Sequence, residues 1–146
     1  MKITYRILVF VLAVLLFTAC GPKSTPMPVS QGDNPYAPQP GDSNMQRDTL
    51  TIDSSSLKLA ESQPKQVTLN FAYFPPTPCH KLRVEVAAPD SQNKINVNAY
   101  TVMEKDKACV LMALATPLQA SLTLGSFPNG HYSVWLNGSL VSEFDS

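Results

Sequence analysis

Thiol and imidazole chemistry in this sequence could come from five side chains: Cys20, Cys79, Cys109, His80 and His131. A thiolate can act as a nucleophile, bind a metal or pair into a disulfide, and an imidazole can act as a base or a metal ligand. The sequence around each residue indicates which of these chemistries applies.

Cys20 closes an apolar run that follows a short positive start at Lys2 and Arg6. Residues 7–17 are eleven apolar residues without a charge. This run is too short to span a hydrocarbon core of about 30 Å, because a helix rises only about 1.5 Å per residue. A positive start, a short apolar core and small residues at the end are typical of a secretory signal peptide.

The four residues Phe17-Thr18-Ala19-Cys20 resemble the lipobox of bacterial lipoproteins. In that family the cysteine thiol receives a diacylglycerol carrying fatty acids such as palmitate, and the signal peptidase cuts just before it. The resemblance implies that residues 1–19 are a lipoprotein signal peptide and that Cys20 is the lipidated first residue. Phe17 departs from the usual Leu at its position. The alternative is that Cys20 is an ordinary late residue of a signal peptide.

Lipidation would make a membrane a partner of this protein. Two or three acyl chains on one residue anchor a protein in a membrane far longer than one chain does. We therefore expect an exported protein anchored to a bacterial membrane by lipidated Cys20. Gly21, and not an aspartate, follows the cysteine. In a cell with two membranes, the resemblance implies the outer membrane or the cell surface.

Cys79 and Cys109 remain as an even pair in an exported protein. An oxidising compartment favours a disulfide between them. The alternative is a reactive thiol beside His80. Neighbouring residues on a strand point to opposite faces, so Cys79 and His80 are badly placed as nucleophile and base.

The sequence contains no arrangement of residues that predicts catalysis. His80 and His131 lie 51 positions apart and belong to no HExxH spacing, and GxSxG, phosphate-loop and CxxC motifs are absent. We expect no catalytic residues, no metal and no cofactor. Removal of residues 1–19 leaves 127 residues with 9 basic and 11 acidic side chains, a balance that offers no electrostatic footprint for nucleic acid.

Residues 20–48 are rich in proline, serine, glutamine and asparagine and contain few apolar residues. Such a segment buries too little surface to offset the entropy of ordering it. It predicts a disordered Pro-rich tether, followed by a single domain over residues 49–146.

From Thr49 onward, apolar and polar residues alternate with period two, which is typical of half-buried strands. Turn signals such as Pro75-Pro76 and Asn137-Gly138 separate the runs. About seven short strands predict an all-β, antiparallel β-sandwich. Residues 109–115 are uniformly apolar and fit either a buried strand, which we favour, or a short helix.

Asn137-Gly138 predicts a two-residue hairpin turn. A regular register from this turn pairs Leu136 with Ser139, Trp135 with Leu140, Val134 with Val141 and His131 with Phe144. The core side would then hold Tyr132, Val134, Leu136 and Val141. The opposite face would carry His131, Trp135, Leu140 and Phe144. This unusually apolar face either covers the edge of the sandwich or is a contact surface.

The segment Leu124–Leu136 resembles the late strand pair of bacterial immunoglobulin-like domains, in which a Gly-x-Tyr step, here Gly130-His131-Tyr132, opens a core strand. A wider pattern over residues 67–144, including Cys79 and Cys109, resembles a domain of uncharacterised bacterial secreted proteins and lipoproteins. The resemblance implies an immunoglobulin-like fold and no particular activity. The sequence lacks the usual Trp between the two cysteines.

These observations predict a non-catalytic, lipid-anchored module that binds or supports a component of the cell envelope, such as a protein or a glycan. Two alternatives remain. The Pro-rich loop of residues 73–79 could act as the rigid loop of an extracellular protease inhibitor. Trp135 could instead serve as the stacking ring of a carbohydrate-binding module.

Overall fold

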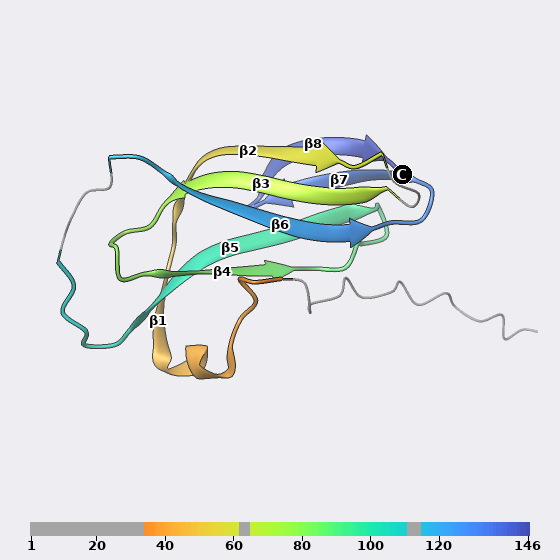
Figure 1. Cartoon of the computed structure of the whole chain (residues 1–146). Helices are drawn as coiled ribbons and strands as arrows, with labels where there is room; N and C mark the ends of the chain where they lie inside the picture. Colours follow the sequence, from red (N-terminus) through yellow and green to blue (C-terminus); the bar gives the residue numbers. More distant parts are fainter. Residues whose placement is uncertain (1–33, 62–64, 111–114) are drawn as a thin grey trace, which may run out of the picture.

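The computed structural model describes residues 34–61, 65–110 and 115–146 (Figure 1). The predicted signal peptide, Cys20 and the first part of the predicted tether lie outside these residues. The described elements are the 3₁₀ helix η2 (Pro40–Asn44) and the strands β1 (Met45–Asp48), β2 (Thr51–Leu59), β3 (Gln66–Phe74), β4 (Lys81–Val86), β5 (Lys94–Glu104), β6 (Leu118–Ser126), β7 (His131–Leu136) and β8 (Ser139–Asp145).

The strands form two sheets, which confirms the predicted all-β sandwich (Figure 1). Strands β2, β3 and β6 make one sheet in the order β2-β3-β6. In the other sheet β5 is central: β4 lies on one side of it, and β1, β7 and β8 lie on the other. All pairs are antiparallel except β5 with β7, which is parallel. This pair departs from the antiparallel sheets of immunoglobulin domains.

The core lies between the sheets and contains the apolar residues that alternate along the strands. On β3, Val67, Leu69 and Phe71 are at most 2% exposed, whereas the intervening Thr68 and Asn70 are half-buried. The period-two pattern therefore identified the correct face of this strand. Buried residues of β5, β6 and β7 complete the core.

Residues 34–48, which we call the N-terminal strap, belong to the folded domain, so the prediction of a disordered tether was wrong for this part. Val84 of β4 donates its backbone N–H to the carbonyl of Tyr36, and the Tyr36 side chain packs against the core. β1 then pairs with β5 from Met45↔Glu104 to Asp48↔Thr101. The strap gains order from these contacts with the sheet, which its own composition does not reveal.

The β7–β8 hairpin follows the predicted register only next to its turn. Leu136 pairs with Ser139 and Trp135 with Leu140, but a bulge between Val134 and Trp135 shifts the remaining pairs by one residue. Tyr132 therefore pairs with Phe144, and His131 pairs with Asp145.

The shift moves Phe144 from the predicted contact surface into the core, where it is 5% exposed. Its ring stacks on that of Tyr132 at a centroid distance of 5.4 Å and lies 5.7 Å from Phe127. Burial of an aromatic ring provides the physical reason for the bulge, because the regular register would leave Phe144 on the outer face. Val141 is partly buried against the core, as predicted.

The apolar segment of residues 109–115 does not begin as a buried strand. Cys109 and Val110 have no regular secondary structure, and Val110 is 75% exposed. Residues 111–114 lie outside the described part of the chain, so their conformation remains a prediction.

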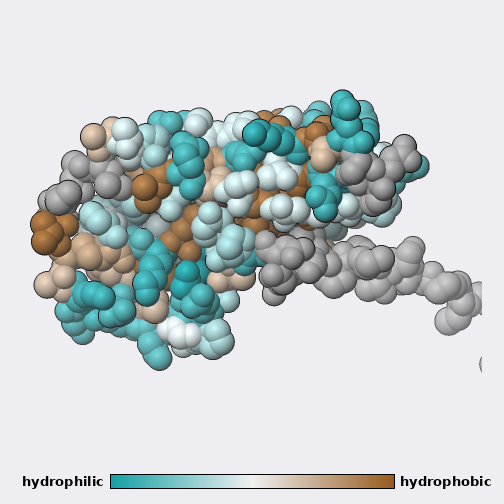
Figure 2. All heavy atoms as spheres, in the orientation of Figure 1, coloured by the Kyte–Doolittle hydropathy of each residue, from teal (hydrophilic) through white to brown (hydrophobic). Residues whose placement is uncertain are grey.

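The surface seen in Figure 2 is mainly polar, with hydrophobic residues in broken patches between polar ones. The exposed large hydrophobic residues of the described chain are Leu59, Val110, Leu118 and Leu140. Within the same residues, no helix has the length and apolar character needed to cross a membrane.

Candidate functional site

Cys79 and Cys109 form the predicted disulfide, with their Cα atoms 6.1 Å apart. The bond joins the loop that follows β3 to the irregular segment that follows β5. Neither sulfur is available as a nucleophile in this state. The pair therefore has a structural role, which agrees with the prediction.

His80, beside the disulfide, fastens this loop to the strap. Its side chain is only 4% exposed, and its Nε2 lies 3.1 Å from the carboxylate of Asp48. The Thr77 backbone N–H donates to Nδ1 at 3.2 Å, so Nδ1 acts as an acceptor and Nε2 carries the hydrogen donated to Asp48. The hydrogen bonds from Gln46 and His80 hold the pKa of Asp48 below its ordinary value.

The structure keeps three residues of the predicted contact surface on the outer face: His131, Trp135 and Leu140. His131 is exposed and lies 2.8 Å from Asp145, whose hydrogen bond raises the pKa of His131. The Lys94 amine lies 4.1 Å from the centre of the Trp135 ring and covers one of its faces. Leu140 is 49% exposed, whereas Phe144 lies in the core and not on this surface.

No group of three or more histidine, cysteine, aspartate or glutamate side chains in residues 34–61, 65–110 and 115–146 could hold a metal ion. The exposed His131 lies within ion-pair distance of Glu143 and Asp145, at 3.5 and 2.8 Å.

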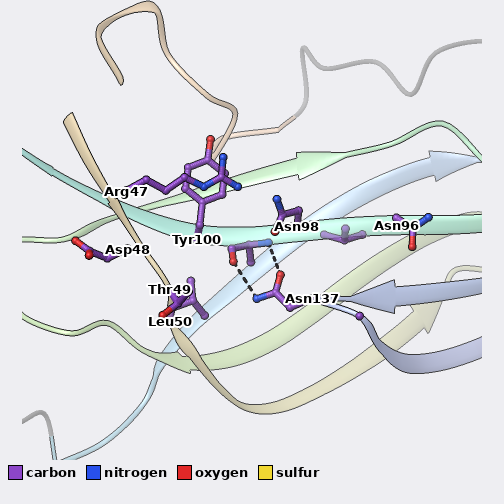
Figure 3. A pocket seen from close by; sticks show the side chains of 11 residues that line it. Arg47, Asp48, Thr49, Leu50, Asn96, Asn98, Tyr100 and Asn137 are labelled. Atoms are coloured by element: carbon purple, nitrogen blue, oxygen red, sulfur yellow. Dashed lines mark hydrogen bonds between the residues drawn. The ribbon is translucent and has the colours of Figure 1, made fainter. Parts of the chain in front are cut away.

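A hollow, which the sequence did not predict, lies between the strap and the β7–β8 hairpin (Figure 3). It has a volume of about 560 Å³. Its lining residues are Arg47, Asp48, Thr49, Leu50, Asn96, Val97, Asn98, Ala99, Tyr100, Asn137 and Gly138.

The hollow exists because β5 changes partners along one edge. β7 pairs with β5 as far as Val97, and β1 begins to pair at Thr101. At Thr49 and Leu50 the chain leaves β1 and crosses to β2 in the other sheet. Three residues of β5 are left between the two partner strands, and the hollow opens at this gap.

The side chain of Asn137 fills the gap in the hydrogen bonding (Figure 3). Its Oδ1 accepts the Ala99 N–H at 2.7 Å, and its Nδ2 donates to the Ala99 carbonyl at 2.9 Å. The carboxamide thus takes the place of the peptide group that a continuous neighbouring strand would supply. Asn137 has a φ of 49°, the left-handed conformation required at its turn position.

One wall of the hollow is a stacked pair, Arg47 over Tyr100. The Arg47 guanidinium carbon lies 3.4 Å from the centre of the ring. The Tyr100 hydroxyl donates to Glu85 at 2.9 Å, and Arg47 lies 3.7 Å from the same carboxylate. Burial, followed by the hydrogen bond to Glu85, raises the pKa of Tyr100.

The floor and rim offer neutral polar groups. Asn96 and Asn98 are exposed and lie on the same face of β5, because they are alternate residues of one strand. Thr49 is also exposed. These amides and this hydroxyl can hydrogen-bond a ligand, but they do not supply a nucleophile with a neighbouring base.

The residues of this site also fit simpler roles in the sequence. Asn96 and Asn98 fitted the solvent-facing half of an alternating strand, and Asn137 fitted a hairpin turn. No local pattern indicates that a turn residue will complete the edge of a strand some 40 positions earlier.

The chain matches no protein-family model, no curated protein and no solved structure. The case for its function therefore rests on its own residues and geometry.

Proposed function

We propose that this protein is a lipid-anchored lipoprotein of the bacterial cell envelope, whose sandwich is a non-catalytic binding module with the hollow as its binding site. The hollow is the observation that carries this proposal. It combines an open volume with exposed amide groups, and β4 pairs with the β5 backbone along the opposite edge from Val97 to Val102.

The proposed location in the cell envelope rests on the lipobox-like sequence that ends at Cys20, and the disulfide supports it. Disulfides persist in oxidising compartments, which an exported protein reaches. Cys20 lies only 14 positions before Asn34, where the described domain begins. A chain of this length spans at most about 50 Å, so a lipid on Cys20 would keep the domain close to its membrane.

Protease inhibition by the Pro-rich loop is a separate candidate function. The disulfide and His80 fix this loop, Pro75 is buried, and Pro76 and Pro78 are exposed. Incubation of the purified full chain with a panel of proteases tests it, and no inhibition at micromolar concentrations would exclude it.

Photo-crosslinking in the native cell tests the binding site. A photoreactive amino acid replaces Asn98 in the full chain, and a matched variant carries it at Ser56, an exposed residue of β2 in the other sheet. The proposal predicts a covalent adduct that forms with the Asn98 probe and not with the Ser56 probe.

Equal adducts at both positions, or none at Asn98, would contradict a binding site at the hollow. In the same cells, retention of a Cys20→Ser variant in the membrane fraction would contradict the proposed anchor.

A further inference from the structure

We infer that the hollow binds a neutral, polyhydroxylated ligand, namely a sugar residue of an envelope glycan. This inference rests on the proposed function and specifies its ligand class. It follows from the charges, the free polar groups and the size of the hollow.

The two charged residues of the hollow are already paired within the domain. Arg47 stacks on Tyr100 and lies 3.7 Å from Glu85. Asp48 accepts hydrogen bonds from Gln46 and lies 3.1 Å from His80. An anionic ligand would compete with Glu85 for the half-exposed Arg47 side chain, and a cationic ligand would compete with His80 for Asp48. A ligand without charge avoids both competitions, so the hollow favours it.

The groups that remain free suit neighbouring hydroxyls. Each carboxamide offers both a donor and an acceptor, and Asn96 and Asn98 present two of them on one face of β5. Asn98 shares one N–H with Glu85 at 3.3 Å, and its oxygen has no partner among the contacts of the described residues. Pairs of adjacent hydroxyls on a sugar ring also offer donors and acceptors together.

The size and surroundings of the hollow agree with this ligand. A volume of about 560 Å³ falls within the range of roughly 300–1,000 Å³ that is usual for small-molecule sites. Trp135 is the register partner of Asn96 on β7, so an aromatic ring flanks the amides. Because Lys94 covers one face of that ring, the asparagines and not stacking on Trp135 would recognise the sugar.

Calorimetric titration of the purified full chain tests the inference, in a detergent without a sugar headgroup, since a glycosidic detergent would compete. The neutral probes are maltotriose and triacetylchitotriose, and the charged comparison is trigalacturonate. We expect saturable binding of at least one neutral probe, and weaker binding of trigalacturonate. Asn96→Ala and Asn98→Ala should each lower the affinity for the neutral probe about fivefold, which is the effect of losing one hydrogen bond.

Asn129→Ala is the matched control, because Asn129 is an exposed asparagine in the turn before β7, at the opposite end of that strand from the hollow. The affinity of the Asn129→Ala variant for the neutral probe should equal that of the unaltered chain. The inference fails if neither neutral probe binds up to about 10 mM. It also fails if trigalacturonate binds more tightly, or if the Asn96 and Asn98 variants bind like the control.

The crosslinking experiment separates this failure from failure of the proposed function. An adduct at Asn98 that proves to be a protein, together with no binding of neutral sugars, would keep the hollow as a binding site and overturn the glycan.

Discussion

Asn137 combines two structural roles in one residue. Its left-handed backbone makes the β7–β8 turn, and its carboxamide pairs with both backbone groups of Ala99. Because Ala99 is buried, a lost partner would leave its N–H without a hydrogen bond. The turn and the edge of the sheet therefore depend on the same side chain.

Asn137→Gly separates these roles, since glycine accepts the positive φ but has no amide. We expect a loss of about 1–3 kcal/mol in the free energy of unfolding, measured by urea denaturation. Asn93→Gly is the control, because Asn93 also has a positive φ of 57° and its side chain makes an exposed hydrogen bond. Equal stability of the two variants would contradict the role assigned to the Asn137 amide.

At the scale of the element, the strap is held to the sheet by a buried ion pair. Arg83 of β4 is 6% exposed and donates to both carboxylate oxygens of Asp42, at 2.7 and 3.0 Å. The hydrogen bond from Arg83 lowers the pKa of Asp42. The pair thus fastens η2 over the outer face of β4.

Arg83→Met should destabilise the domain by roughly 2–4 kcal/mol at neutral pH, because it leaves the Asp42 carboxylate without its partner. Since the pKa of Asp42 is lowered in the folded state, its contribution is present above the unfolded pKa of about 3.9 and is lost as the pH falls through the folded pKa. Urea midpoints between pH 7 and 2 should therefore fall more steeply below pH 4 in the unaltered chain than in Arg83→Met. Parallel curves would contradict this role.

The bulge in the β7–β8 hairpin makes a second prediction at this scale. Phe144→Ala should cost about 3 kcal/mol or more in the free energy of unfolding, because Phe144 packs against Tyr132 and Phe127. Leu140→Ala, at an exposed position, should change it by less than about 0.5 kcal/mol. Similar losses in both variants would favour the regular register.

Comparison of the elements shows which features local patterns can predict. Alternation predicted strands at the positions of β3 to β7, because a strand with one buried face must alternate, and the Asn137-Gly138 turn predicted β8. Tyr36 and β1 were missed, since the strap is ordered by β4 and β5, which lie far along the chain. The bulge and the hollow were missed for the same reason: both depend on contacts between elements.

At the scale of the whole molecule, the disulfide joins segments separated by 30 residues. The chain-entropy estimate for a loop of this size is about 3.5 kcal/mol. We expect reduction to lower the free energy of unfolding by about this amount, measured by urea denaturation with and without reductant. A Cys79→Ser, Cys109→Ser variant should be insensitive to reductant, and an equally insensitive unaltered chain would contradict a stabilising bridge.

In the proposed function, one residue, Cys20, joins the folded binding module to a membrane. Metabolic labelling with radioactive palmitate, followed by intact-mass measurement of the purified protein, tests this claim most directly. We expect label and diacylglycerol mass on a chain that begins at Cys20, and neither on the Cys20→Ser variant. An unaltered chain without an acyl group, or a Cys20→Ser variant that is still labelled, would contradict the account.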